Sequence, residues 1–129
     1  MATWSEVQQY IRSNYIVQSE PDDKMMRLEF NTTDGRSQLL FVEAPIHVDG
    51  LPNFVGFFSP VAERAKVSAD KLLDLGYTGL GVLARGNYIG IYHAALVDTI
   101  DSQEIDVPIR FIIAIADLAE KELTGKDMF

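Results

Sequence analysis

The chain begins with apolar residues at helical spacing. Trp4, Val7 and Ile11 recur at intervals of three and four residues, which is the period of one helix face. Thr3-Trp4-Ser5-Glu6 fits a capping box, in which the threonine side chain accepts from the backbone and the glutamate reaches back. The pattern therefore predicts a first helix that begins at this box and ends near Asn14.

Alternation of apolar and polar residues at period two follows, and it predicts strands. Tyr15–Ser19 is a short candidate strand that stops at the turn-forming cluster Pro21-Asp22-Asp23. Met26–Asn31 alternates regularly, and Asp34-Gly35 then turns the chain back into Ser37–Ala44. Together these segments predict a three-strand meander, after which residues 44–53 predict an irregular loop.

The segment Phe54–Pro60 resembles a strand, but it carries apolar residues on both of its faces. Phe54 and Phe58 would point to one face, while Val55 and Phe57 would point to the other. A strand with no polar face is typical of the middle of a sheet. We therefore expect either a central strand or a strand covered by another subunit.

A short helix and a hairpin are predicted next. Ser68 is a candidate N-cap for a helix that ends at Gly76. Leu80–Arg85 and Tyr88–Val97 then flank Gly86-Asn87, a two-residue connection of the kind that tight hairpins use. This pattern predicts a helix followed by two antiparallel strands.

The last helix carries more apolar surface than one neighbour can cover. Asp106 is its predicted N-cap, Pro108 is placed in its first turn, and Gly125 is predicted to end it. At a helical period its polar residues fall on one arc: Arg110, Asp117, Glu120 and Lys121. Everything outside this arc is largely apolar.

Two sides of this helix are assigned to different neighbours. The ridge of Phe111, Ile115 and Leu118 is expected to pack on the sheet of the same chain. The flank that carries Ile109, Ile113 and Ala116 is expected to face a second subunit or a client protein. The predicted partner-binding or dimer surface consists of that flank and the phenylalanines of the central strand: Ile109, Ile113, Ala116, Phe54 and Phe58.

Strands grouped together, with helices before, between and after them, indicate an α+β fold with a largely antiparallel sheet. The predicted order is helix, three-strand meander, further strand, helix, β-hairpin and C-terminal helix. A length of 129 residues suits a single domain with a sizeable core.

Charge and composition limit the classes of partner and chemistry that the chain can have. The net charge of −8 repels phosphate backbones and anionic lipids, so we expect neither nucleic acid nor a membrane as partner. The chain has no cysteine, which excludes thiol catalysis, disulfides and cysteine-ligated metals. Its first residues lack the pattern of a secretory signal, and no apolar run reaches the roughly 18 residues of a membrane span. We expect a cytoplasmic protein.

Three groups of residues have some of the features of a chemical site. Gly79–Ala84 matches the dinucleotide fingerprint G-x-G-x-x-A, but it lies in a predicted hairpin, where no helix follows to bind phosphate. Four acidic residues close together offer oxygen ligands, but they lack the spacing of a calcium loop: Asp98, Asp101, Glu104 and Asp106. The loop Pro45–Asn53 brings His47 and Asp49 together, and Arg64 or Arg85 could lie beside it. We expect no cofactor and no metal.

The order of several short motifs resembles one family. These are Trp4-Ser5-Glu6-Val7, Gly35-Arg36-Ser37-Gln38, Leu72-Leu73, and the ending from Ala116-Asp117 through Glu120 and Gly125 to Asp127 and Phe129. Over essentially its whole length the chain resembles the YbjN-type proteins, whose fold is that of type III secretion chaperones. The resemblance implies a small α+β domain that forms homodimers and binds segments of other proteins.

Two functions are therefore left open. The first is a non-catalytic protein- or peptide-binding module that acts as a homodimer and holds an apolar segment of another protein. The alternative is a small metabolite-binding domain or enzyme that uses the 45–53 loop.

Overall fold

A computed structural model of the chain describes residues 3–46, 48–75 and 79–129. All strand pairs in the described part are antiparallel, and the sheet order is β1-β2-β3-β4-β6-β5. This arrangement confirms the α+β class and the predicted order of elements. The elements are α1 (Trp4–Asn14), β1 (Val17–Asp22), β2 (Met25–Asn31), β3 (Ser37–Ile46), β4 (Phe54–Glu63), α2 (Ala69–Asp74), β5 (Gly81–Arg85), β6 (Tyr88–Leu96) and α3 (Ser102–Thr124).

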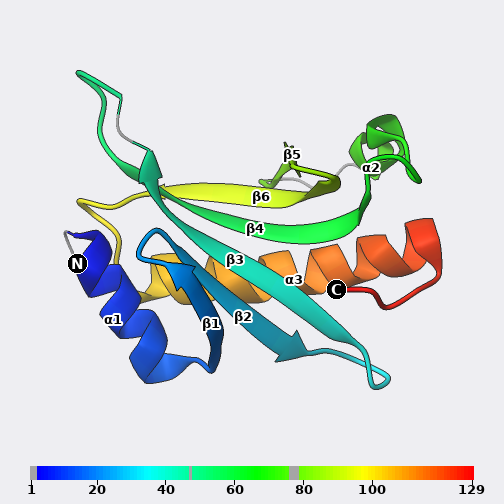
Figure 1. Ribbon diagram of the computed structural model, residues 1–129, viewed down its shortest axis with the longest axis horizontal. Coiled ribbons are helices and arrows are strands. Elements are labelled where there is room, and N and C mark those ends of the chain that lie inside the picture. Colours follow the sequence, from blue (N-terminus) through cyan, green and yellow to red (C-terminus); the bar gives the residue numbers. More distant parts are fainter. Residues whose placement is uncertain (1–2, 47, 76–78) are drawn as a thin grey trace.

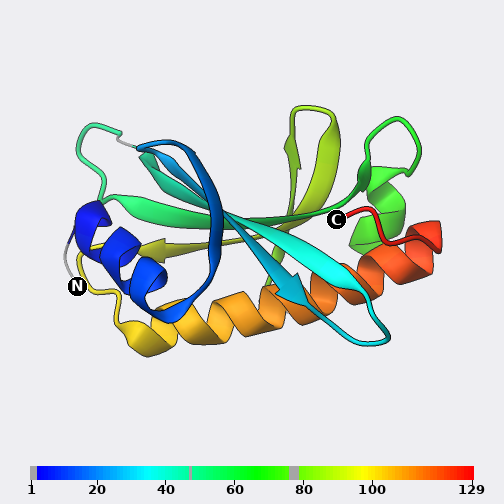
Figure 2. The same cartoon turned by 60° about the horizontal axis from the view of Figure 1, so that its bottom comes forward.

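The long helix α3 runs along one face of the sheet, where it contacts β3, β4 and β6 (Figure 1). Figure 2 shows α3 beneath the sheet and the β5–β6 hairpin rising from the other side. The core fills the layer between α3 and the sheet, and α1 adds Val7 and Ile11 to it. Among the described residues, no helix as long as α3 lies across the opposite face of the sheet.

Local sequence chemistry explains the element ends. The Thr3 side chain accepts a hydrogen bond from the Glu6 backbone N–H at 3.1 Å, so the predicted N-cap of α1 is confirmed. Asp34 and Gly35 have φ of 57° and 73°, the left-handed values that a tight hairpin turn requires. Ser68 caps α2, whereas the predicted stop at Gly76 lies outside the described residues.

The start of α3 differs from the prediction. Asp101 is the N-cap, and its Oδ1 accepts from the Glu104 backbone N–H at 2.8 Å. Pro108 therefore lies inside the helix rather than in its first turn. Asp106 instead accepts hydrogen bonds from the hydroxyls of Tyr10 and Tyr15 and so ties α1 to α3. Asp101 and Asp106 are both of a residue type that caps helices. The hydrogen bonds from the tyrosines, which come from a distant part of the chain, engage Asp106 and leave the capping role to Asp101.

The packing of α3 reverses the two sides that the sequence suggested. Ile109, Ile113 and Ala116 are buried against the sheet, so the expectation that they face a partner was wrong. Phe111 and Leu118, expected in the core, are 47% and 44% exposed. Asp117 and Glu120, expected on the solvated arc, are buried as well. The reason is the β2–β3 hairpin, which supplies an arginine to these carboxylates and so allows the polar residues to turn inward.

The central position of β4 is confirmed. All of its residues between its first and its last are buried, and it pairs with β3 on one side and β6 on the other. Phe58 is therefore buried within the chain itself, which corrects its assignment to a partner surface, whereas Phe54 remains 43% exposed.

Candidate functional site

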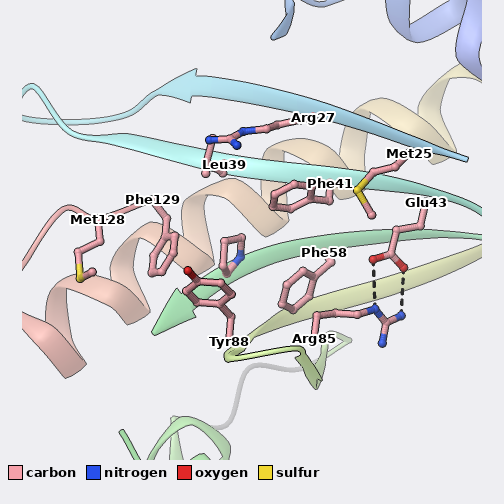
Figure 3. Close-up of a pocket in the computed structure, with 11 residues that line it drawn as sticks. Met25, Arg27, Leu39, Phe41, Glu43, Phe58, Arg85, Tyr88, Met128 and Phe129 are labelled. Atoms are coloured by element: carbon pink, nitrogen blue, oxygen red, sulfur yellow. Dashed lines mark hydrogen bonds and ion pairs between the residues drawn. The ribbon is translucent and has the colours of Figure 1, made fainter. Parts of the chain in front are cut away.

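The sheet face opposite α3 is hollowed into an apolar groove of about 380 Å³, which we call the sheet trough (Figure 3). This volume lies within the range of pockets that bind ligands. Strands β2 to β6 contribute to it, together with the segment that follows α3. Its lining consists of Met25, Arg27, Leu39, Phe41, Glu43, Phe58, Pro60, Arg85, Tyr88, Met128 and Phe129.

Strand register brings these side chains together. Arg27 pairs with Phe41 on the next strand, and Phe41 pairs with Phe58 on the strand after that. Residues directly opposite in neighbouring strands point to the same face, so alternate residues of each strand line the trough. Gly90 makes room for the Phe58 ring, since a Cβ at position 90 would come within 2.7 Å of that ring. The trough is thus a property of the sheet rather than of any single segment.

The charged groups of the trough are mostly engaged with each other. Arg85 donates two hydrogen bonds to the Glu43 carboxylate, at 3.2 and 3.0 Å, and its guanidinium lies 5.5 Å from the Tyr92 ring centroid. The hydrogen bond to Glu43 raises the pKa of Arg85. Arg27 lies over the Phe41 ring, and its buried Nε has no hydrogen-bond partner among the described residues. The trough therefore combines apolar walls with an Arg85–Glu43 ion pair that is already satisfied within the chain.

A second, smaller hollow of about 220 Å³ continues along the same face. It shares Glu43 with the sheet trough and adds Phe54 and part of the preceding loop. Val48, Leu51 and Phe54 are exposed large apolar side chains at its edge. The two hollows are therefore neighbours on this face, with Glu43 in the lining of both.

The residues proposed for a small-molecule site are not brought together. Arg85 lines the sheet trough, whereas Arg64 lines a separate hollow. There the Arg64 guanidinium donates a hydrogen bond to the backbone carbonyl of Gly86 at 3.4 Å. Asp49 is exposed in the loop, and His47 lies outside the described residues. Sequence reasoning missed Glu43, the partner of Arg85, because nothing in the local pattern of β3 distinguishes it from a solvated strand residue.

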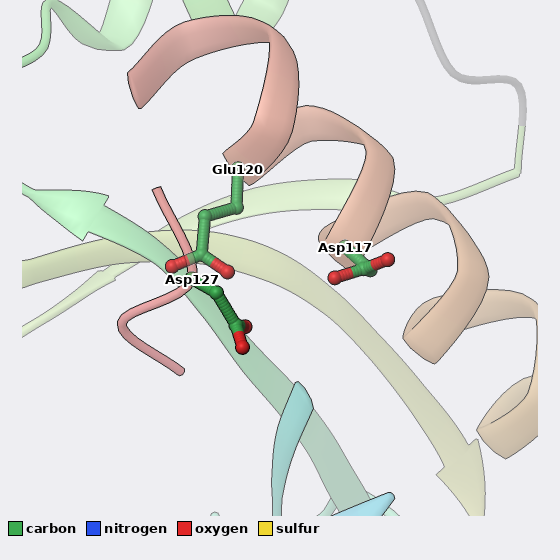
Figure 4. Close-up of side chains that lie close together, drawn as sticks. All are labelled: Asp117, Glu120 and Asp127. Carbon is green, nitrogen blue, oxygen red and sulfur yellow. The ribbon is translucent and has the colours of Figure 1, made fainter. Parts of the chain in front are cut away.

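A second feature lies where the β2–β3 hairpin meets the end of α3 (Figure 4). Asp117, Glu120 and Asp127 have carboxylate oxygens within 4.8 Å of one another, a spacing that a cation could use. Arg36 already supplies positive charge there: its Nε donates to Asp117 at 3.0 Å and its Nη2 approaches Glu120 at 3.4 Å. We therefore interpret the cluster as an ion-pair network in which Asp117 and Glu120 are buried and Asp127 is exposed, and we propose no metal.

The same cluster holds the segment after α3, Lys126–Phe129. Arg36 donates to the Lys126 carbonyl at 2.9 Å, and the Glu120 carboxylate accepts from the backbone N–H groups of Met128 and Phe129 at 2.8 and 3.2 Å. The Phe129 ring then packs edge-on against Tyr88 with centroids 5.3 Å apart. This network places Met128 and Phe129 at one end of the sheet trough.

Burial raises the pKa of the Glu120 carboxyl above its ordinary value of 4.5, although Arg36 and two backbone N–H groups favour the charged form. The folded state therefore binds this proton more tightly than the unfolded chain does. The resulting stabilisation is complete below the unfolded pKa and is lost as the pH rises through the raised folded pKa.

This titration makes a testable prediction. Between pH 4 and pH 7, the free energy of unfolding of the parent should fall relative to that of the Glu120→Gln variant, because glutamine does not titrate. Urea unfolding at intervals across this range measures the difference. Parallel curves for the two proteins would show that Glu120 titrates as in the unfolded chain.

The remaining motifs do not form a site. Gly81–Arg85 is strand β5 and leads into the Gly86-Asn87 turn, so no helix opens at Ala84 and the dinucleotide reading is excluded. The acidic residues between 98 and 106 do not belong to the carboxylate cluster found among the described residues. Asp101 and Asp106 instead serve α3 as its cap and as the tyrosine acceptor.

No helix in the described part of the chain combines the length and the apolar character needed to cross a membrane. Comparisons of the chain with protein-family models, with curated proteins and with solved structures found no match. The function must therefore be argued from the surfaces described above.

Proposed function

We propose that the protein is a non-catalytic binding module that holds an extended apolar segment of another polypeptide in its sheet trough. The observation that carries this proposal is the apolar hollow on the sheet face opposite α3. Tyr88 and Met128 are 40% and 47% exposed at its edge. Exposed apolar side chains gathered around a hollow are typical of binding surfaces.

The shape of the surface favours a polypeptide over a compact ligand. The sheet trough and the second hollow meet at Glu43, so an extended chain can place one side chain in each of them. The lining is dominated by apolar and aromatic side chains, so the expected segment presents apolar or aromatic side chains to it.

The charges in the trough support binding rather than catalysis. A general base needs a carboxylate or imidazole that is available to the substrate. Glu43 is the acidic residue that lines the trough, and both of its carboxylate oxygens accept from Arg85. The alternative, a metabolite-binding domain or enzyme that uses the 45–53 loop, gains no specific support, because Arg64 and Arg85 line separate hollows.

The proposal includes a homodimer. The outer side of α3 exposes Val107, Phe111 and Leu118, and an apolar stripe of this kind is typical of a surface that another subunit covers. The resemblance to YbjN-type proteins and type III secretion chaperones supports both a dimer and the binding of protein segments. A cytoplasmic location remains part of the same proposal.

Selection of peptides from a random display library tests the binding function. We expect the selected peptides to be rich in apolar residues, and Tyr88→Ala to weaken their binding about tenfold, a cost of roughly 1.4 kcal/mol. Leu73→Ala is the matched control, because Leu73 is also exposed, at 57%, but lies outside both hollows. Fluorescence polarisation of labelled peptides measures the affinities.

Methionine methyl resonances locate the bound peptide without any substitution. Met25 and Met128 line the sheet trough, whereas Met26 points into the core with no exposed surface. Bound peptide should shift the Met25 and Met128 methyl signals and leave the Met26 signal in place. Peptides that bind Tyr88→Ala and the parent equally well, or a library that yields no peptide, would contradict the proposal.

A further inference from the structure

The outer side of α3 carries a regular apolar seam. Val107, Phe111, Ala114 and Leu118 are all exposed, and they follow one another at intervals of four, three and four residues. This is the spacing at which one helix packs against another in a coiled coil. We call these four residues the α3 seam. The opposite side of the helix is already packed on the sheet, so only this side is available to a second helix.

The seam also contains a hollow that could accept a side chain from another helix. Val107, Arg110, Phe111 and Ala114 border a shallow hollow of about 330 Å³. Residues at positions i, i+3, i+4 and i+7 are the four that form a hole for the knob of a facing helix. This hollow therefore fits one side chain from another helix rather than an extended strand.

The sequence of the seam is complementary to itself when it is reversed. If a second α3 runs antiparallel and crosses between residues 112 and 113, Val107 meets Leu118 and the large Phe111 meets the small Ala114. The same register places Glu104, which is exposed in the first turn, opposite Lys121 near the other end. Opposite charges then meet at both ends of the seam, because a twofold axis repeats each contact.

A parallel pairing lacks this complementarity. In register, it would place Phe111 against Phe111, Glu104 against Glu104 and Lys121 against Lys121. Like charges that face each other disfavour association. The two phenylalanines would also crowd one layer of the interface, while the small Ala114 would leave the next layer poorly filled.

We propose that two copies of this chain associate through antiparallel α3 helices, seam against seam, with Glu104 of each copy facing Lys121 of the other. This inference rests on the homodimer of the proposed function and specifies its surface and direction. The two sheet troughs would then lie on the outer sides of the dimer, because Figure 2 shows α3 on one side of the sheet and the trough residues line the opposite face.

Charge reversal tests the register. Glu104→Lys and Lys121→Glu should each weaken dimerisation, because each places like charges at both ends of the seam. The double variant should restore the dimer, since it exchanges the two charges and keeps them complementary. Sedimentation equilibrium gives the dissociation constants, and thermal unfolding identifies any variant that is destabilised as a monomer. Single variants that dimerise as the parent does would overturn the proposal.

Disulfide crosslinking tests the direction, and it is unambiguous because the chain has no cysteine of its own. An oxidised mixture of the Val107→Cys and Leu118→Cys variants should form a crosslinked dimer that contains one of each. Neither variant should crosslink efficiently with itself. Self-crosslinking of Val107→Cys would overturn the antiparallel arrangement while leaving the homodimer in place. A parent that is monomeric at all concentrations would remove the dimer, but it would not affect the test of peptide binding in the trough.

Discussion

Replacing Arg36 by alanine is expected to lower the free energy of unfolding by about 3–5 kcal/mol at pH 7, the usual cost of leaving buried charges without a partner. The Arg36 side chain is 13% exposed, and those of Asp117 and Glu120 are 9% and 0% exposed. Both carboxylates are therefore largely shielded from water in the folded protein, and Arg36 supplies the positive charge beside them. Urea unfolding measures the loss.

The matched control is Arg12→Ala, which breaks another arginine–carboxylate pair. The Arg12 and Glu20 side chains are 48% and 31% exposed, so water solvates both after the change and stability should barely alter. A loss at Arg36 as small as the one at Arg12 would contradict the view that the Arg36 cluster is effectively desolvated.

The pH dependence gives a second readout of the same substitution. Without Arg36, protonation of Glu120 removes a buried charge that has lost its counterion, so the destabilisation should shrink as the pH falls towards 4.5. Combining Arg36→Met with Asp117→Asn and Glu120→Gln removes the charges together and should recover much of the stability. Recovery would separate the electrostatic cost from the loss of packing.

Gly90→Ala is expected to cost about 3 kcal/mol, near the upper end of the usual penalty for overpacking. A Cβ at this position would lie 2.1 Å from the Ser59 carbonyl oxygen and 2.7 Å from the Phe58 ring. The first of these neighbours is backbone in the central strand, so relief requires β4 and β6 to move apart. The melting temperature and the urea midpoint should both fall.

Gly81→Ala is the control for the loss of a strand glycine. A Cβ there would meet the Tyr92 carbonyl at 3.6 Å, which is an ordinary contact. Alanine is also better than glycine within a strand by roughly 0.5–1 kcal/mol, so stability should stay the same or rise slightly. Equal effects of the two substitutions would show that the close approach of β4 and β6 does not constrain position 90.

Much of the fold could be predicted because many element boundaries depend on nearby residues. The Thr3 cap, the Asp34-Gly35 turn and the helix end at Gly125 each follow from the backbone conformation or the hydrogen bond that the residue itself supplies. Phe54–Pro60 has no polar face, which predicts from local sequence alone a strand that is either central or covered by another subunit. The structure shows that it is central.

The sheet trough and the Arg36 cluster could not be predicted in the same way. Arg36 lies 81 residues from Asp117 and 84 from Glu120 in the sequence, and each residue alone is an ordinary surface type. The trough gathers one to three side chains from each of five strands. A local turn fixes the register of the two strands that it joins. Which residues meet across the trough also depends on the pairing of β3 with β4 and of β4 with β6, and these pairs are not joined by a tight turn.

The sequence by itself determined that this is an α+β protein with an antiparallel sheet and a last helix that carries surplus apolar surface. Only the tertiary structure decided which side of that helix faces the sheet. The apolar residues extend so far around the helix that hydrophobicity alone allows more than one orientation. Arg36 helps to resolve the choice, because it partners Asp117 and Glu120 in the interior and leaves Val107, Phe111 and Leu118 outside.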